Sequence, residues 1–202
     1  GGNCNTAIGE KALAANTTGC YNNAIGGCVL CKNTTGCYNN AIGYNALYYN
    51  TTGCSNTAIG QCALAYTTGC YNTALGENAL RFNTTGSSNF AVGKETMVKN
   101  STASYNIGIG WQTLYWAKSG GSNTALGKEA LMNSWGGSNN FAAGNRALYA
   151  NTTGSYNTAI GYNASYYNTT GGYNNAIGYE ALRNNTTGAH NQAIGYKALC
   201  GS

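Results

Sequence analysis

Small and large apolar residues alternate in two short stretches that recur along the chain. Residues 33–49 read NTTGCYNNAIGYNALYY, where Ala-Ile and Ala-Leu are separated by a Gly and two further residues. Each stretch is too short for a helix, and the surrounding Gly and Asn residues are typical of turns. The pattern therefore predicts two short β-strands in every repeat.

The pentad Asn-Thr-Ala-Ile-Gly at residues 5–9 returns in varied form about every 17 residues. Its glycines are Gly9, Gly26, Gly43, Gly60, Gly76, Gly93, Gly110, Gly127, Gly144, Gly161, Gly178 and Gly195. The interval is always 17 residues, except for 16 between Gly60 and Gly76, where the coil is expected to lack its Asn. Such a period is typical of a solenoid. We expect an all-β parallel β-solenoid of twelve coils, forming one domain over residues 1–202 with degenerate middle coils at 86–150.

Strand residues alternate between two faces, so Ile42 is expected to face away from Ala41, and Leu47 away from Ala46. Burial of the larger side chains releases more free energy. We therefore expect the Ile and Leu ladders to fill the interior and both Ala ladders to lie outside.

An Asn stands four residues before each of these glycines. The set is Asn5, Asn22, Asn39, Asn56, Asn72, Asn89, Asn106, Asn123, Asn140, Asn157, Asn174 and Asn191. Stacked coils bring such side chains together, which predicts a ladder of amide hydrogen bonds. The recurring Gly predicts a bend with positive φ or a tight backbone contact.

Charged residues make up only 7% of the chain, and the net charge of +5 comes from scattered Lys and Arg. Without a cationic run or an apolar stretch of about 18 residues, neither nucleic-acid binding nor membrane insertion is expected. Asp is absent, and His190 is the only His. We therefore expect no catalytic residues, no metal site and no cofactor.

Nine Cys residues indicate an exported, oxidising setting. Cys20, Cys37, Cys54 and Cys70 share one position of the repeat, and adjacent coils place their Cα atoms about 4.8 Å apart, close enough for a disulfide. The pairs Cys20–Cys37 and Cys54–Cys70 are candidate disulfides, with Cys37–Cys54 as an equally spaced competitor. Cys4 and Cys200, near the two ends, are candidates for a link between subunits.

Asn-x-Ser/Thr sequons recur on one predicted bend of the coil. They begin at Asn16, Asn33, Asn50, Asn83, Asn100, Asn151, Asn168 and Asn185. Because the bend is expected to be exposed, these residues are candidate glycosylation sites, and covalent glycans are a candidate partner.

The NTAIG motif, for example in NTAIGYNASYYNTTGGYNNAIGYEAL at 157–182, resembles the head repeats of trimeric autotransporter adhesins. It is also similar to the NTAIGYNAL/NTTG-type repeats of phage tail-fibre and bacterial surface proteins. The resemblance implies a left-handed parallel β-roll with two strands per coil. It also implies an extracellular location or one on a cell or virion surface.

Joining one copy's end to another's start gives an interval of 16 residues between Gly195 and Gly9, which equals the short interval inside the chain. Exposed sheet edges favour such head-to-tail stacking, which propagates into a filament. The predicted function is a structural subunit of a self-assembling extracellular fibre. The alternatives are a trimeric adhesin or phage tail-fibre segment that binds a receptor, a fragment cut in register from a longer protein, and an ice-binding solenoid.

Overall fold

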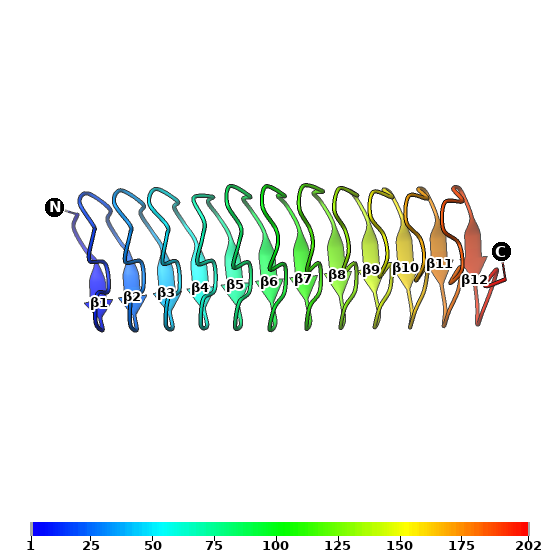
Figure 1. Ribbon diagram of the computed structural model, residues 1–202, viewed down its shortest axis with the longest axis horizontal. Helices are drawn as coiled ribbons and strands as arrows, with labels where there is room; N and C mark the ends of the chain where they lie inside the picture. Colours follow the sequence, from blue (N-terminus) through cyan, green and yellow to red (C-terminus); the bar gives the residue numbers. More distant parts are fainter. Residues whose placement is uncertain (1, 202) are drawn as a thin grey trace. The chain divides into compact units, whose positions relative to one another are not determined.

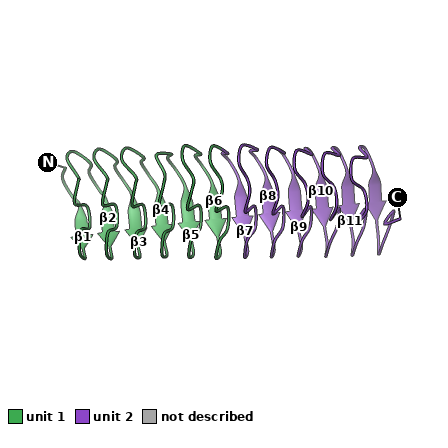
Figure 2. Cartoon of the chain, in the orientation of Figure 1, with its two compact units in different colours: residues 1–102 green, residues 103–202 purple. Residues whose placement is uncertain are grey.

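A computed structural model describes residues 2–201, which are all-β and contain no helix. The chain falls into two compact units, residues 1–102 and 103–202 (Figure 2). In each unit one short strand per coil pairs in parallel with the strand of the next coil (Figure 1). The predicted parallel β-solenoid with a spacing of about 17 residues is confirmed. The sequence predicted one domain, and the division between the units falls inside the degenerate middle coils.

The strands of the first unit are β1 (Thr6–Ile8), β2 (Asn23–Ile25), β3 (Asn40–Ile42), β4 (Thr57–Ile59), β5 (Thr73–Leu75) and β6 (Phe90–Val92). Those of the second unit are β7 (Ile107–Ile109), β8 (Thr124–Leu126), β9 (Phe141–Ala143), β10 (Thr158–Ile160), β11 (Asn175–Ile177) and β12 (Gln192–Ile194). The register pairs equivalent positions of successive repeats: Ala24 pairs with Ala41, and Ile25 with Ile42. Each position of the repeat therefore becomes a column of side chains.

The middle residue of each strand points into the coil, whereas the sequence pattern predicts that it points outward. Ala41 in β3 is fully buried, whereas Ile42 is 38% exposed. Both Ala ladders expected outside lie inside, since Ala46 is also fully buried, and the Ile ladder expected inside lies outside. A coil of this length, closed by tight turns, encloses little volume. One Leu and two methyl groups per coil fill that volume, so the Ile side chain is left on the outer face.

The second apolar stretch is not a strand, so the expectation of two strands per coil is wrong. In the coil that contains β3, Asn45 and Leu47 have φ values of 57° and 51°. Strands require negative φ, and the left-handed conformation costs about 1–2 kcal/mol in a non-glycine residue. The Leu47 side chain is fully buried, as predicted for the Leu ladder, and this burial offsets the cost. The Leu47 N–H donates to the Ala63 carbonyl of the next coil over 3.0 Å.

Both reasons expected for the recurring Gly hold in the structure. Gly43 has a φ of 123°, in the region that favours glycine. A Cβ atom added there would lie 2.9 Å from the carbonyl carbon and oxygen of Gly60 in the next coil. Position and conformation therefore both exclude a side chain.

The short coil contains two Thr residues at its bend, Thr67 and Thr68, but the first of them takes the place of the Asn. In other coils the first Thr of the bend donates from Oγ1 to its counterpart's carbonyl, as Thr34 does to Thr51 over 2.9 Å. Thr68 makes this bond to Thr84 over 3.0 Å. Thr68 is therefore the first Thr of the bend, and Thr67 occupies the place of the Asn. The residue that the short coil omits is thus the second Thr, whereas the sequence suggested the Asn.

Candidate functional site: polar columns and an aromatic groove

The Asn residues of the pentad form a hydrogen-bonded column in each unit. Oδ1 of Asn22 accepts the backbone N–H of Asn39 over 3.0 Å and its Nδ2 over 3.1 Å. Nδ2 of Asn39 also donates to the Gly53 carbonyl of the following coil over 2.8 Å. Because these side chains are buried, each bond is shielded from water. The column binds one coil to the next and is part of the scaffold.

The asparagines of the sequons form a second internal column and do not present their amides to solvent. Asn33 is fully buried, and its Nδ2 donates to Oδ1 of Asn16 over 2.9 Å and to the Gly36 carbonyl over 3.0 Å. The candidate sites that the structure places in this column, all buried except the partly buried Asn16, are Asn16, Asn33, Asn50, Asn83, Asn100, Asn151, Asn168 and Asn185. An N-linked glycan must be attached at this nitrogen. The prediction of glycosylation at these residues therefore conflicts with the folded structure.

All nine cysteines lie among the described residues and are free thiols. The pairs Cys20–Cys37 and Cys54–Cys70 are therefore not disulfides in this structure. The predicted column is present, but its sulfur atoms contact the backbone. Sγ of Cys37 accepts the N–H of Cys20 over 3.1 Å, and Sγ of Cys70 accepts that of Cys54 over 3.2 Å.

The candidates for a link between subunits, Cys4 and Cys200, lie in the first and last coils. Cys4 is exposed and Cys200 is partly exposed. Both thiols are accessible, and a disulfide between copies stays a prediction.

Ion pairs with Lys or Arg are formed by Glu10, Glu77, Glu129 and Glu180. Glu129, nearly buried, lies 2.6 Å from Nε of Arg146 and 3.5 Å from Nζ of Lys128. The hydrogen bond to Glu129 and its negative charge raise the pKa of Arg146. Likewise, Glu77 lies 3.1 Å from Nζ of Lys94 and raises the pKa of that lysine, mainly through their hydrogen bond. These two carboxylates tie neighbouring coils together electrostatically.

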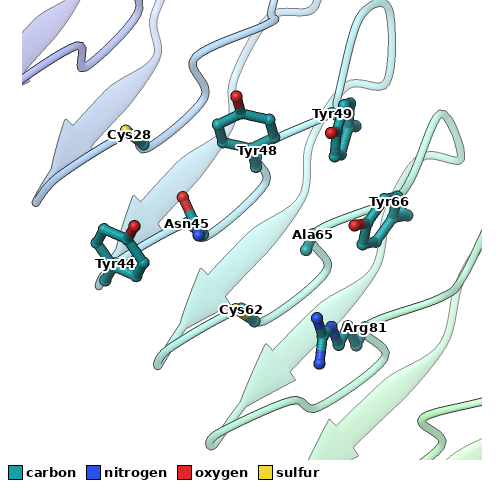
Figure 3. A pocket seen from close by; sticks show the side chains of 9 residues that line it. All are labelled: Cys28, Tyr44, Asn45, Tyr48, Tyr49, Cys62, Ala65, Tyr66 and Arg81. Carbon is teal, nitrogen blue, oxygen red and sulfur yellow. The ribbon is translucent and has the colours of Figure 1, made fainter.

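A groove of about 250 Å³ opens in the first unit, on the turn segments that follow the strands (Figure 3). Its lining comes from four coils and is rich in tyrosine. The lining residues are Cys28, Tyr44, Asn45, Tyr48, Tyr49, Cys62, Ala65, Tyr66 and Arg81. Aromatic faces, one amide and one guanidinium therefore meet in a single concave site.

The groove is formed by a small residue that stands between two large ones in one column. Tyr48, Ala65 and Arg81 hold the same place in three successive coils, and Figure 3 shows Ala65 on the middle coil. The backbone register agrees, because Tyr49 N–H donates to the Ala65 carbonyl over 2.8 Å and Tyr66 N–H to the Arg81 carbonyl over 3.0 Å. Ala65 lines the groove at this place and is itself almost fully buried.

Stacked rings form one wall of the groove. Tyr49 and Tyr66 have ring centroids 4.6 Å apart with planes at 21°, and Phe82 continues the stack 5.2 Å beyond Tyr66. Tyr48 meets the Tyr49 ring edge to face at 4.5 Å. These contacts restrict each ring, so the wall is preorganised for a ligand.

Arg81 supplies the positive charge of the groove. Its guanidinium lies 5.0 Å from the Phe82 ring centroid, and Nη1 is 3.4 Å from Oδ1 of Asn78. Nε of Arg81 is buried and has no hydrogen-bond partner among the described residues. Within residues 2–201, the ion pairs formed by Glu side chains do not include Arg81. The groove therefore offers a cation to an anionic ligand.

The sequence alone does not reveal this groove, because tyrosines at variable positions of the repeat look like ordinary variation. Comparing successive coils at the position of Ala65 would have shown a small residue between Tyr48 and Arg81. The depth of the groove also depends on the turn conformation of this segment, for which the sequence pattern predicts a strand.

Comparison with protein-family models, curated proteins and solved structures finds no match to this chain. Within residues 2–201 no helix is long and apolar enough to cross a membrane. The same residues contain no cluster of three His, Cys, Asp or Glu side chains suited to a metal ion.

Proposed function

We propose that the chain is a structural subunit that assembles by adding coil to coil, so that copies stack head to tail into an extracellular fibre. One observation carries this proposal. A Cβ atom added to Gly178 would meet the carbonyl oxygen of Gly195 at 2.3 Å, but one added to Gly195 would meet nothing within 4 Å. The surface that the next coil covers at Gly178 is thus open at Gly195, in the last coil that the structure describes.

Other positions of the last coil support the same proposal. Leu199 is 50% exposed, whereas Leu131 and Leu148 in the same column are fully buried. Oδ1 of Asn174 accepts the N–H of Asn191 over 3.0 Å, whereas Oδ1 of Asn191 accepts no hydrogen bond within residues 2–201. A coil from a second copy would bury the Leu side chain and continue the Asn column. Open edges of parallel strands favour this kind of addition.

Negative-stain microscopy of the purified protein, combined with mass photometry over a range of concentrations, tests the proposal. Filaments that lengthen with concentration are expected. Discrete trimers would favour the adhesin or tail-fibre alternative, and single subunits at high concentration would contradict assembly altogether.

A Leu199→Glu variant makes the test specific to the coil end. Leu199 is half exposed in the single chain, so a carboxylate is tolerated there, but stacking would bury it without a partner. We expect discrete particles from this variant and filaments from the matched control Gln192→Lys, which adds a charge on the exposed outer face of the same coil. Filaments of equal length from both variants would exclude stacking through this surface.

Ice binding is a second candidate, favoured by one observation on the strands. The first and third residues of each strand share the outer face, so Thr57 and Ile59 lie on either side of the buried Ala58. Thr holds the first place in β1, β4, β5, β8 and β10, so a hydroxyl group and an aliphatic side chain share the outer face in those coils. Measurement of thermal hysteresis tests this function, and its absence at millimolar protein would exclude it.

A further inference from the structure

The second unit contains the same column with its middle place filled. Tyr149, Tyr166 and Arg183 occupy in three successive coils the place that Tyr48, Ala65 and Arg81 occupy in the first unit. The backbone register matches, because Ala150 N–H donates to the Tyr166 carbonyl over 3.0 Å and Tyr167 N–H to the Arg183 carbonyl over 3.0 Å.

The Tyr166 ring shows what this place accommodates. Its plane is parallel to that of Tyr149, at an interplanar angle of 0° and a centroid distance of 4.9 Å. On its other side, Cζ of Arg183 lies 5.8 Å from the Tyr166 ring centroid. A six-membered aromatic ring therefore fits between a tyrosine and an arginine that are two coils apart.

We propose that the groove of the first unit binds a small aromatic carboxylate of the hydroxybenzoate class. Its ring lies over Ala65, between Tyr48 and Arg81, where Tyr166 lies between Tyr149 and Arg183. Its carboxylate accepts hydrogen bonds from the Arg81 guanidinium.

The negative charge of the ligand follows from a difference between the two arginines. Nε of Arg183 lies 3.5 Å from Oε1 of Glu180, which stands two residues after its coil's glycine. The residue at that place in the coil of Arg81 is Asn78, which is neutral. The first unit thus has the same cation without the carboxylate, and a ligand that brings one supplies charge-assisted hydrogen bonds.

The ring character of the ligand follows from the walls and size of the groove. Two coil steps of about 4.8 Å separate Tyr48 from Arg81, which leaves the thickness of one ring between them. The stacked Tyr49 and Tyr66 rings enclose the side of this place. The volume of about 250 Å³ is below the roughly 300–1,000 Å³ of typical drug-sized pockets, which suits a single ring with one substituent.

The test is titration of the full chain with 4-hydroxybenzoate, followed by calorimetry and by tyrosine fluorescence. One site per chain is expected. Ala65→Tyr fills the groove with the side chain found in the second unit and should weaken binding at least tenfold. Because Tyr166 already occupies the equivalent place, this variant is expected to keep the wild-type melting curve. Unchanged affinity in a folded Ala65→Tyr variant would overturn the proposal.

The role of Arg81 is tested separately. Arg81→Gln should weaken 4-hydroxybenzoate binding about tenfold and leave binding of neutral 4-hydroxybenzamide unchanged. Equal losses for both ligands would contradict the assigned contact. Cyclohexanecarboxylate and glucuronate probe the ring itself, and binding of either with the affinity of 4-hydroxybenzoate would contradict an aromatic ligand.

The reciprocal change builds the site in the second unit. The double variant Tyr166→Ala/Glu180→Asn opens the equivalent place and removes the carboxylate that pairs with Arg183. A rise in stoichiometry from one to two ligands per chain is expected. If this variant is folded and still binds one ligand, the column geometry does not define the site.

Discussion

Nδ2 of Asn50 donates to Oδ1 of Asn33, one coil earlier, over 3.0 Å, but Oδ1 of Asn50 itself has no hydrogen-bond partner within residues 2–201. The cause is the short coil, where Thr67 occupies the place of the next Asn. Oγ1 of Thr67 accepts hydrogen bonds from Nδ2 of Asn83 and from the N–H of Gly69, and it makes none with Oδ1 of Asn50. In the first unit the sequon column is thus interrupted at Thr67, and the interruption leaves the buried acceptor of Asn50 unsatisfied.

Thr67→Asn should repair the column. The new amide can donate to Oδ1 of Asn50, and one recovered buried hydrogen bond contributes about 0.5–1.5 kcal/mol. We expect the free energy of urea unfolding to rise by about this amount. The matched control Thr67→Val removes the hydroxyl that Asn83 and Gly69 use and should lower it. A fall in stability for both variants would show that the short coil has no room for the amide.

Asn33→Asp tests the sequon column by removing a buried hydrogen-bond donor. The substitution replaces the donor Nδ2 with an oxygen that faces Oδ1 of Asn16 and the Gly36 carbonyl, in a fully buried site. A buried, unpaired carboxylate is expected to lower the free energy of unfolding by about 3–5 kcal/mol.

The same substitution on the outer face is the control. Asn40 is exposed in β3, so Asn40→Asp should change stability by less than about 0.5 kcal/mol. The carboxyl group that Asn33→Asp introduces should also have a folded pKa above its unfolded value, because burial disfavours its charged form. The loss should therefore be smaller at about pH 3, where the group is protonated in both states, and should grow as the pH rises through about 4 and above. Equal destabilisation at both pH values would argue against burial of this side chain.

Gly43→Ala should prevent folding of the coil. Its Cβ would lie 2.9 Å from backbone atoms of Gly60, and its φ of 123° is strained for any residue with a side chain. A loss of more than about 4 kcal/mol, or insoluble protein, is expected. In Gly27→Ala the new Cβ would meet the Tyr44 ring at 3.3 Å, and a side chain can move. A Gly43→Ala protein as stable as Gly27→Ala would mean that the coils are not stacked as described.

The period, the parallel stacking and the special role of the glycine could be predicted from the sequence, because each depends on spacing alone. Which face of the strand points into the core could not be predicted. The alternation of Ala41 and Ile42 is equally compatible with either face inward, and the choice depends on how much volume the coil encloses. That volume is set by Asn45 and Leu47, which have left-handed conformations without being Gly. Asn adopts this conformation readily, but Leu gives no local signal for it. The same turns create the groove at Ala65, so the candidate site was missed for the same reason.

The phase of the strand can be tested with two substitutions at adjacent residues. Ala41 is fully buried, so Ala41→Leu inserts a large side chain into a packed interior and should lower the free energy of unfolding by about 1–3 kcal/mol or more. Ile42 is 38% exposed on the outer face, so Ile42→Ala should cost less than about 1 kcal/mol. Urea unfolding monitored by circular dichroism measures both. With the Ile ladder inside, Ile42→Ala would instead cost about 2–5 kcal/mol and Ala41→Leu would be mild. The order of the two stabilities therefore decides which face of the strand forms the core.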